Sequence, residues 1–319
     1  MNFLYDNFIS DAIVFVFKWL VGFLSDYGLT IIILTLLIKI CLMPFDLKQR
    51  ASSRKMSAIS AEVQGIQKRY ANNPEQANKK VQELYKERKI SPMAGCWPML
   101  VSMVFLFAFY GALRVVATER TIAIYLDAVQ NGAETIKLPG FLWIHNIFQA
   151  DSGMTGVLPD ASTFVTFIQQ NATYITPQSI KMLVDADIIS LSNGVMAAGP
   201  QFEAVRMAIL EANGVAKEGV ELYNNGWFVL PLIAGVSLFL QQKFMSKSSG
   251  QSVDQQPGGK MMLYFFPVFS AYICCTANAI FSIYWVMSNI YSIALTFILN
   301  AYYKNKDKKK DVTSENFRR

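Results

Sequence analysis

Histidine and cysteine are scarce in this chain of 319 residues, which contains one histidine, His145, and four cysteines. A single imidazole is too little for a histidine metal site or a Cys/His catalytic pair. The cysteines, at positions 41, 96, 274 and 275, show neither a disulfide framework nor zinc-ligand spacing. Gly259-Lys260 is followed by Met261 and not by Ser or Thr, so it is no phosphate-binding loop. We therefore expect no metal, cofactor or nucleotide.

Charge is missing from four long stretches, at residues 28–38, 92–113, 226–242 and 261–303. The chain is 53% apolar, with a mean hydropathy of +0.28, which is typical of a membrane protein. A spanning helix needs about 20 residues, so the last stretch is long enough for two helices. The sequence predicts an all-α polytopic fold with five spans, at residues 28–45, 92–116, 227–243, 260–276 and 278–303.

The basic residues predict the orientation of these spans. Residues 46–91 contain 11 Lys and Arg against 5 Asp and Glu, and the tail 304–319 contains 7 against 3. Residues 117–225 contain 5 against 11. Since basic flanks stay on the cytoplasmic side, we expect the first span to run inward, residues 117–226 to lie outside, and the C-terminus to be cytoplasmic.

The N-terminal segment 1–27 contains a short apolar run, residues 12–24, with Lys18 in its middle and Asp11 and Asp26 at its flanks. A secretory signal would begin with basic residues, which are absent before position 11. We interpret the run as an interfacial helix on the outer face. A sixth span with a cytoplasmic N-terminus is the alternative.

The cytoplasmic segment 46–91 predicts a helical hairpin. Asn73 can cap its second helix, with Pro74 at the first helical position. The apolar residues that recur at helical spacing are Met56, Ile59 and Val63 in the first helix and Val81, Leu84 and Tyr85 in the second. The hairpin is either a docking arm or a charged pair without a partner, and its basic excess also suits anionic lipid. The polar residues 244–259 are expected to form a loop.

The outer segment 117–226 carries a predicted helical insertion at residues 152–225. Thr176-Pro177 and Gly199-Pro200 predict helix starts, and Asn213-Gly214 predicts a helix end. No cluster of residues in it suggests catalysis, and its function is not predicted.

Lys39 is the ionisable residue inside the first span. Buried charges in membranes are costly and usually functional, although the long Lys39 stem could instead snorkel to the inner interface. Other spans carry polar groups toward their cytoplasmic ends; these groups are Ser102, Gln241, Gln242, Tyr264, Ser288 and Asn289. Together they predict a hydrophilic groove open to the cytoplasm, in which a cation would attract a carboxylate.

Six motifs in order resemble the YidC/Oxa/Alb family of membrane protein insertases. They are Leu34 to Phe45 with Gln49 and Met56; Pro92 with Gly95-Cys96-Trp97-Pro98; Phe141-Leu142-Trp143-Ile144; Leu230-Pro231 with Gly235 and Phe239-Leu240-Gln241-Gln242-Lys243; Lys260-Met261-Met262 with Pro267; and Ile283-Tyr284-Trp285 with Ser288-Asn289. The resemblance extends from about Phe15 to Tyr303, the insertion apart.

The resemblance implies a five-helix core around a groove that releases small membrane proteins sideways into lipid without nucleotide. Lys39 matches the position of the family's groove arginine. Ser102 matches a position that is often Gln, and Gln241 or Gln242 and Trp285 match groove or last-span positions. The family's hairpin is thought to receive substrate. Asn278 and Ile280 stand where relatives often have Pro and Gly, and the insertion replaces an almost direct connection to the third span.

The expected function is that of an insertase, not an enzyme, in a bacterial cytoplasmic membrane. The chain lacks an Arg- and Ser-rich leader of the kind that directs import into organelles. Expected partners are nascent membrane proteins and lipid, without direct DNA binding, and a Sec-type translocon and a ribosome stay open. The alternatives are a small-solute transporter that uses Lys39, although the halves show no repeat, and a receptor that binds a ligand through its insertion.

Overall fold

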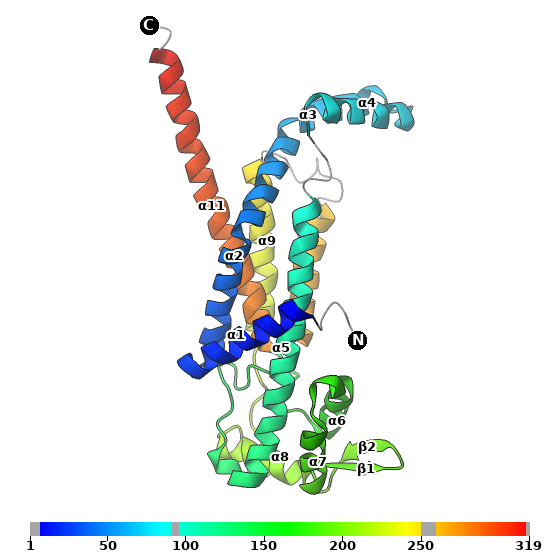
Figure 1. The fold of residues 1–319 in the computed structure, drawn as a ribbon, viewed down its shortest axis with the longest axis vertical. Helices are drawn as coiled ribbons and strands as arrows, with labels where there is room; N and C mark the ends of the chain where they lie inside the picture. Colours follow the sequence, from blue (N-terminus) through cyan, green and yellow to red (C-terminus); the bar gives the residue numbers. More distant parts are fainter. Residues whose placement is uncertain (1–6, 91–95, 250–259, 317–319) are drawn as a thin grey trace. The chain divides into compact units, whose positions relative to one another are not determined.

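The computed structural model describes residues 7–90, 96–249 and 260–316 and is mainly helical (Figure 1). The apolar stretches form α2 (Tyr27–Ala58), α5 (Cys96–Asn131), α9 (Val229–Ser249), α10 (Phe266–Thr276) and α11 (Ala279–Asn316). Within the described residues, length and composition allow three helices to cross a membrane, at Tyr27–Met56, Val229–Lys247 and Ala279–Lys304, and a shorter apolar helix covers Met261–Thr276. The protein is therefore an all-α polytopic membrane protein. Pro92 to Gly95 of the expected second span lie outside the described residues.

The chain folds into two compact units. Unit 1 contains residues 1–34, 104–234 and 270–285, and unit 2 contains residues 35–103, 235–269 and 286–319. Because α2, α5, α9 and α11 each contribute residues to both units, the units are not separate domains along the sequence.

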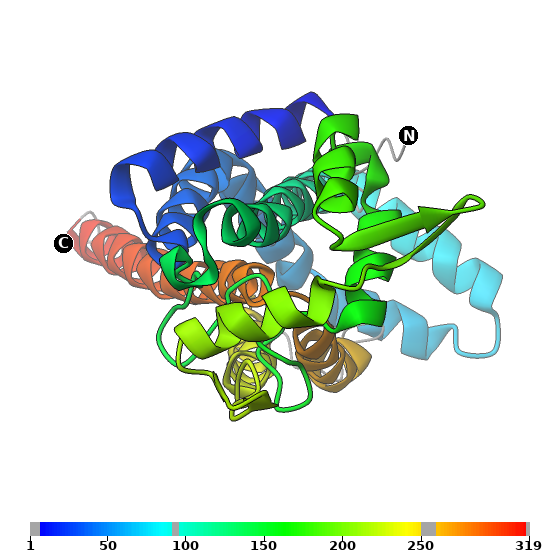
Figure 2. The ribbon, with the colours of Figure 1, turned by 90° about the horizontal axis from the view of Figure 1, so that it is seen from below.

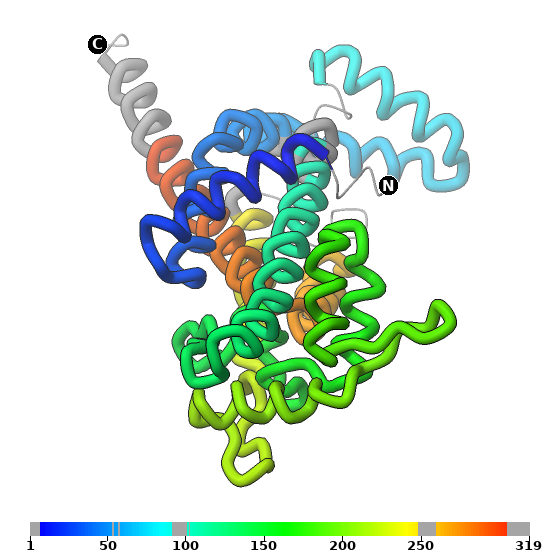
Figure 3. Tube along the Cα trace, turned by 60° about the horizontal axis from the view of Figure 1, so that its bottom comes forward, coloured from blue at the N-terminus to red at the C-terminus, as the bar shows by residue number. Residues whose placement is uncertain are grey.

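In unit 1, the N-terminal helix α1 (Phe8–Leu24) crosses α5 (Figures 1 and 3). One face of α1 is buried through Ile13, Phe17 and Leu20, and Lys18 Nζ forms an ion pair with Glu119 Oε2 of α5 at 2.6 Å. Helix α1 thus lies across α5, and whether it is interfacial or a sixth span stays a prediction.

The opposite face of α1 is a stripe of exposed large side chains. Phe8, Phe15, Trp19 and Phe23 are between 65% and 80% exposed. Their spacing places them on one side of the helix. We call these four residues the aromatic stripe; such side chains suit the membrane–water interface.

The insertion at residues 152–225 contains three α-helices, namely α6 (Ala161–Gln170), α7 (Pro177–Asp185) and α8 (Phe202–Ala212). Its core includes a ring cluster in which Tyr125 of α5 packs against Phe164 at 4.6 Å and Phe202 at 5.4 Å between centroids. Arg206 is buried and donates to Glu203 and Glu221. Burial alone would lower the pKa of Arg206, but the Glu221 hydrogen bond and the two carboxylates raise it.

The helical prediction for the insertion omitted two small antiparallel hairpins. One pairs β1 (Ile189–Ser192) with β2 (Val195–Ala198), and the other pairs β3 (Ala216–Lys217) with β4 (Val220–Glu221). The first hairpin extends away from the helices of the insertion (Figure 2). Because the Gly199 amide still donates to Ile188 at this hairpin, α8 begins at Phe202 and not at Gly199-Pro200 as predicted.

The N-terminal end of α9 is held by a buried carboxylate. Asp151 is fully buried and accepts hydrogen bonds from the amides of Trp227 at 2.8 Å and Leu230 at 2.6 Å. Its Oδ2 also accepts from the Trp143 indole at 3.1 Å. A Cβ at Gly226 would overlap Asp151 Oδ1. A negative group at this position offsets the partial positive charge of the helix end.

The beginning of α11 is hydrogen-bonded to the segment before the insertion. The amides of Ala279 and Ile280 donate to the carbonyls of Gln149 at 2.8 Å and Ile147 at 2.9 Å. Both residues are fully buried. Of the two residues that differ from the family pattern, Asn278 thus directly precedes α11, and Ile280 lies in its first turn with its amide hydrogen-bonded.

In unit 2, α2 continues beyond the predicted end of the first span at residue 45. Pro44 lies inside the helix, which ends at Ala58. Beyond Pro44, Arg54 stacks over the Tyr303 ring of α11 at 3.8 Å, a contact that stabilises the extended helix. Residues Met261–Phe265 form a π-helical turn before α10, where the missing amide of Pro267 removes one regular α-helical hydrogen bond.

The predicted hairpin consists of α3 (Ser60–Arg69) and α4 (Pro74–Glu87), which lie side by side (Figure 3). Asn73 caps α4 by accepting from the Gln76 amide at 3.1 Å, with Pro74 at the first position, as the sequence predicts. Arg88 Nη2 binds Glu62 Oε2 across the pair at 2.9 Å. The first helix of the pair begins at Ser60, so Met56 belongs to α2 instead.

Candidate functional site

The candidate site in unit 2 is a charged face of α2. Lys39, Asp46 and Arg50 are spaced seven and four residues apart, about two turns and one turn, so they share one side of the helix. All three side chains are half-buried. Asp46 interacts electrostatically with both cations, which gives this face two positive charges around one carboxylate. We call these three residues the charged face.

Arg50 is positioned by α11. Its guanidinium donates to the Thr296 hydroxyl at 2.6 Å and to the Ser292 carbonyl at 2.9 Å. Both acceptors are neutral, so they hold the orientation of Arg50 without compensating its positive charge. The Tyr291 hydroxyl interacts electrostatically with Asp46 and Arg50, and it is buried without a hydrogen-bond partner among the described residues.

The two predicted groove glutamines lie in α9, also in unit 2. Gln241 and Gln242 are both half-buried. The side-chain amide oxygen Oε1 of Gln241 is buried and has no hydrogen-bond partner among the described residues. It is therefore available to water or to a polar ligand. Asn289, by contrast, donates to the Ser237 hydroxyl at 3.0 Å and thus joins α11 to α9.

For two further predicted groove residues, Trp285 and Ser102, membership of the groove stays a prediction. Trp285 belongs to unit 1, where its ring packs against Phe281 at 5.6 Å between centroids. Its indole nitrogen is buried without a partner in the described part of the chain. The side chain of Ser102 lies outside the described residues, so its role stays a prediction.

The hairpin residues predicted to receive substrate are largely turned inward. Ile59 is 5% exposed and Leu84 is 8% exposed. Val63, Val81 and Tyr85 are half-buried. Burial of these side chains holds α3 against α4, so any contact with substrate would use their remaining exposed surface or the charged residues around them.

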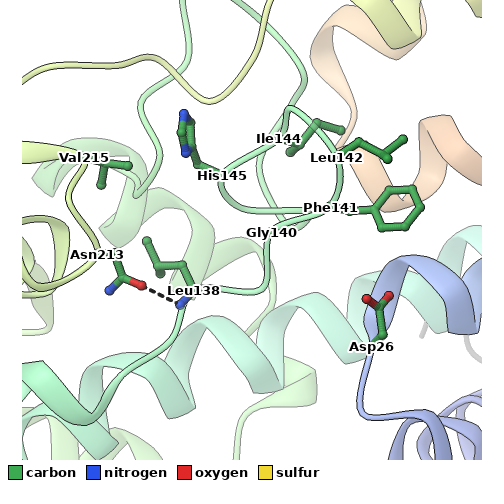
Figure 4. Close-up of a pocket in the computed structure, with 9 residues that line it drawn as sticks. All are labelled: Asp26, Leu138, Gly140, Phe141, Leu142, Ile144, His145, Asn213 and Val215. Atoms are coloured by element: carbon green, nitrogen blue, oxygen red, sulfur yellow. Dashed lines mark hydrogen bonds between the residues drawn. The ribbon is translucent and has the colours of Figure 1, made fainter.

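A hollow of about 560 Å³ opens in unit 1 at the beginning of α2 (Figure 4). Its polar side chains already have structural roles. Asp26 accepts from the Leu29 amide at 2.7 Å, Asn213 accepts from the Leu138 amide at 2.9 Å, and the His145 ring stacks on Tyr223 at 5.6 Å. Among the described residues no group of three His, Cys, Asp or Glu could hold a metal ion. We therefore place the candidate site on the charged face.

Sequence reasoning identified Lys39 but missed Asp46, Arg50 and Tyr291. Asp46 and Arg50 were counted only as part of the basic hairpin, because the span was expected to end at residue 45. If α2 is assumed to continue past Pro44, the spacing of Lys39, Asp46 and Arg50 predicts that they share one helix face. The contact of Arg50 with Thr296 joins residues 246 positions apart, and no local pattern predicts it.

Fold and site together define a polytopic helical membrane protein with a half-buried charged face on one of its apolar helices. A family model described as "60Kd inner membrane protein" matches residues 19–198 and 191–308. The chain belongs to this family, which confirms the resemblance seen in the sequence.

Curated relatives carry the name membrane protein insertase YidC. The protein of Chlorobium limicola is 26% identical over 294 residues, which cover 92% of this chain and 36% of that relative. The protein of Clostridium perfringens is 32% identical over 169 residues, covering 50% of this chain and 63% of the relative. The protein of Fusobacterium nucleatum subsp. nucleatum is 29% identical over 249 residues, covering 77% and 98% respectively. The alignments thus span under two thirds of the first two relatives.

Proposed function

We propose that this protein is a membrane insertase that moves short acidic segments of nascent membrane proteins across a bacterial cytoplasmic membrane. The observation that carries the proposal is a half-buried cation, Lys39, in the apolar helix α2 of a chain whose family relatives are named insertases. Lys39 lies six residues before Phe45, the predicted cytoplasmic end of the first span, which is about 9 Å along the helix axis. A cation at that depth lowers the cost of bringing a carboxylate into the bilayer.

The proposed groove combines Lys39 with Gln241 and Gln242, and with Ser102 and Trp285 as further members. Polar side chains would keep water near a passing segment, and the segment's apolar helix would then leave into lipid. Burial of that helix supplies the driving force, and the membrane potential favours outward movement of negative charge. No bond is made or broken, so the proposed activity is not enzymatic.

The proposed topology has five spans, an outer insertion and a cytoplasmic C-terminus. The hairpin α3–α4 would lie on the cytoplasmic side and receive substrate, either directly or through its contact with anionic lipid. Whether a Sec-type translocon or a ribosome is a further partner stays open.

The test is the insertion of a single-span protein with an acidic translocated tail into proteoliposomes, scored by protease protection. Lys39→Ala is expected to reduce protection and Lys39→Arg to retain it, because arginine keeps the positive charge. A further arm deletes residues 73–90 and is expected to reduce insertion while the spans stay folded. Equal protection by wild type, Lys39→Ala and Lys39→Arg would refute the groove charge. Protection no higher than in empty vesicles would favour the alternative function, a small-solute transporter that uses Lys39.

A further inference from the structure

We infer that Asp46 sets the substrate specificity of the charged face, because its carboxylate competes with acidic substrate groups for Lys39 and Arg50. The inference rests on the proposed function and deepens it. It assigns to one residue of α2 the preference between acidic and uncharged translocated segments.

The position of Asp46 carries the argument. It shares one helix face with Lys39 and Arg50 and lies between them. It interacts electrostatically with both cations. A carboxylate in that position is chemically the same group that an acidic substrate would bring to the face.

Asp46 is nevertheless not locked into an ion pair. Within the described residues, neither Asp46 nor Lys39 has an opposite charge within 4.0 Å. Arg50 is four residues from Asp46, the spacing of a helix ion pair, but its guanidinium binds Thr296 and Ser292 instead. The cations are thus attracted to Asp46 without being sequestered by it, so a substrate carboxylate can replace this attraction.

The arrangement also limits the size of the effect. Lys39 and Asp46 are about 10 Å apart along the helix axis. For an effective dielectric constant of about 20, the loss of the Asp46 charge corresponds to about a tenfold change in the occupancy of Lys39 by a carboxylate. Water and salt reduce this value, so we expect about a threefold to tenfold gain.

The experiment compares Asp46→Asn with wild type in proteoliposomes, using one single-span protein with an uncharged, a singly acidic or a triply acidic tail. Asp46→Asn is expected to raise insertion of the acidic tails about threefold to tenfold relative to the uncharged tail. Asp46→Glu keeps the charge and is expected to leave this ratio unchanged. Asp185→Asn, an exposed site in α7, makes the same change in net charge and serves as the control.

The outcomes separate this inference from the proposed function. The gain from Asp46→Asn should be smaller in the Lys39→Ala background, in which Arg50 alone remains as a cation of the charged face. If Lys39→Ala lowers acidic insertion while Asp46→Asn gives no acidic preference, the inference fails and the proposed function stands. If Lys39→Ala has no effect, the proposed groove charge fails. A loss of insertion of all three tails by Asp46→Asn, with lower thermal stability and rescue by Asp46→Glu, would assign Asp46 a structural role and overturn the inference.

Discussion

Replacement of Asp151 by alanine should release the beginning of α9. Asp151 is fully buried and accepts three hydrogen bonds, from the Trp227 and Leu230 amides and the Trp143 indole. A hydrogen bond to a charged acceptor contributes about 1.5–3 kcal/mol, and each donor left unpaired adds a desolvation cost. Since such contributions are not additive, we expect a total loss of roughly 3–5 kcal/mol of local stability.

Hydrogen exchange measured by mass spectrometry on residues 226–232 in detergent tests this expectation directly. About 1.4 kcal/mol corresponds to a tenfold change in an equilibrium constant. Protection of the Trp227 and Leu230 amides should therefore fall by roughly two to three orders of magnitude. Asp151→Asn keeps one acceptor oxygen and should lie between alanine and wild type.

Asp160→Ala provides the matched control. Asp160 is also an aspartate that caps a helix of the outer segment, but it is exposed. Its removal should cost about 1 kcal/mol in α6 and leave residues 226–232 unchanged. Exchange at those residues that is the same in Asp151→Ala and wild type would show that the carboxylate does not hold the helix end, and the reasoning would be wrong.

Three further predictions follow from local geometry and charge. Gly28→Ala should lower the melting temperature, because its Cβ would overlap the Phe141 ring. A Cβ at Gly22 in α1 meets nothing within 4 Å, so Gly22→Ala should be neutral or stabilising. A similar effect of both changes on thermal unfolding would contradict this packing. The pKa of Asp160 is lowered by hydrogen bonds from the Thr163 amide and the Ser162 hydroxyl, so its stabilisation is present above the unfolded pKa of about 3.9 and is lost as the pH falls through the lower folded value. Protection of the α6 amides relative to their intrinsic exchange rates should thus fall with acid in wild type and change less in Asp160→Asn, and equal acid dependence of this protection would refute the assignment. In a variant without native cysteines, Asn73→Cys should react with an impermeant maleimide from the cytoplasmic side and Met154→Cys, at a site 84% exposed, from the outside; labelling of both from one side would refute the topology.

Local signals predicted local structure well. Asn73-Pro74 and Thr176-Pro177 mark helix starts in the structure, and α8 ends at Asn213-Gly214 as predicted. The capping hydrogen bond in each case joins residues three or four positions apart, so the sequence alone determines it. The Asn193-Gly194 turn of the first hairpin was an equally local signal, since both residues adopt positive φ, but it was overlooked.

The parts that were missed depend on distant residues. Asp151 holds the amides of residues 76 and 79 positions away, and a buried aspartate cannot be told from a surface one by its neighbours in sequence. The continuation of α2 to Ala58 was not predicted, because the first span was expected to end at residue 45, where charged residues begin. Contacts of Arg50 and Arg54 with α11 stabilise the longer helix, and these contacts exist only in the folded chain.

The aromatic stripe of α1 has a consequence for how the N-terminal region responds to lipid composition. Many interfacial helices add a basic face, so their binding strengthens on anionic lipid and weakens in salt. Residues 8–24 contain one basic and one acidic residue, Lys18 and Asp11, and Lys18 is paired with Glu119. We therefore expect α1 to associate with neutral and anionic bilayers alike and to do so independently of ionic strength, so that its depth is governed by the thickness and packing of the lipid headgroup region.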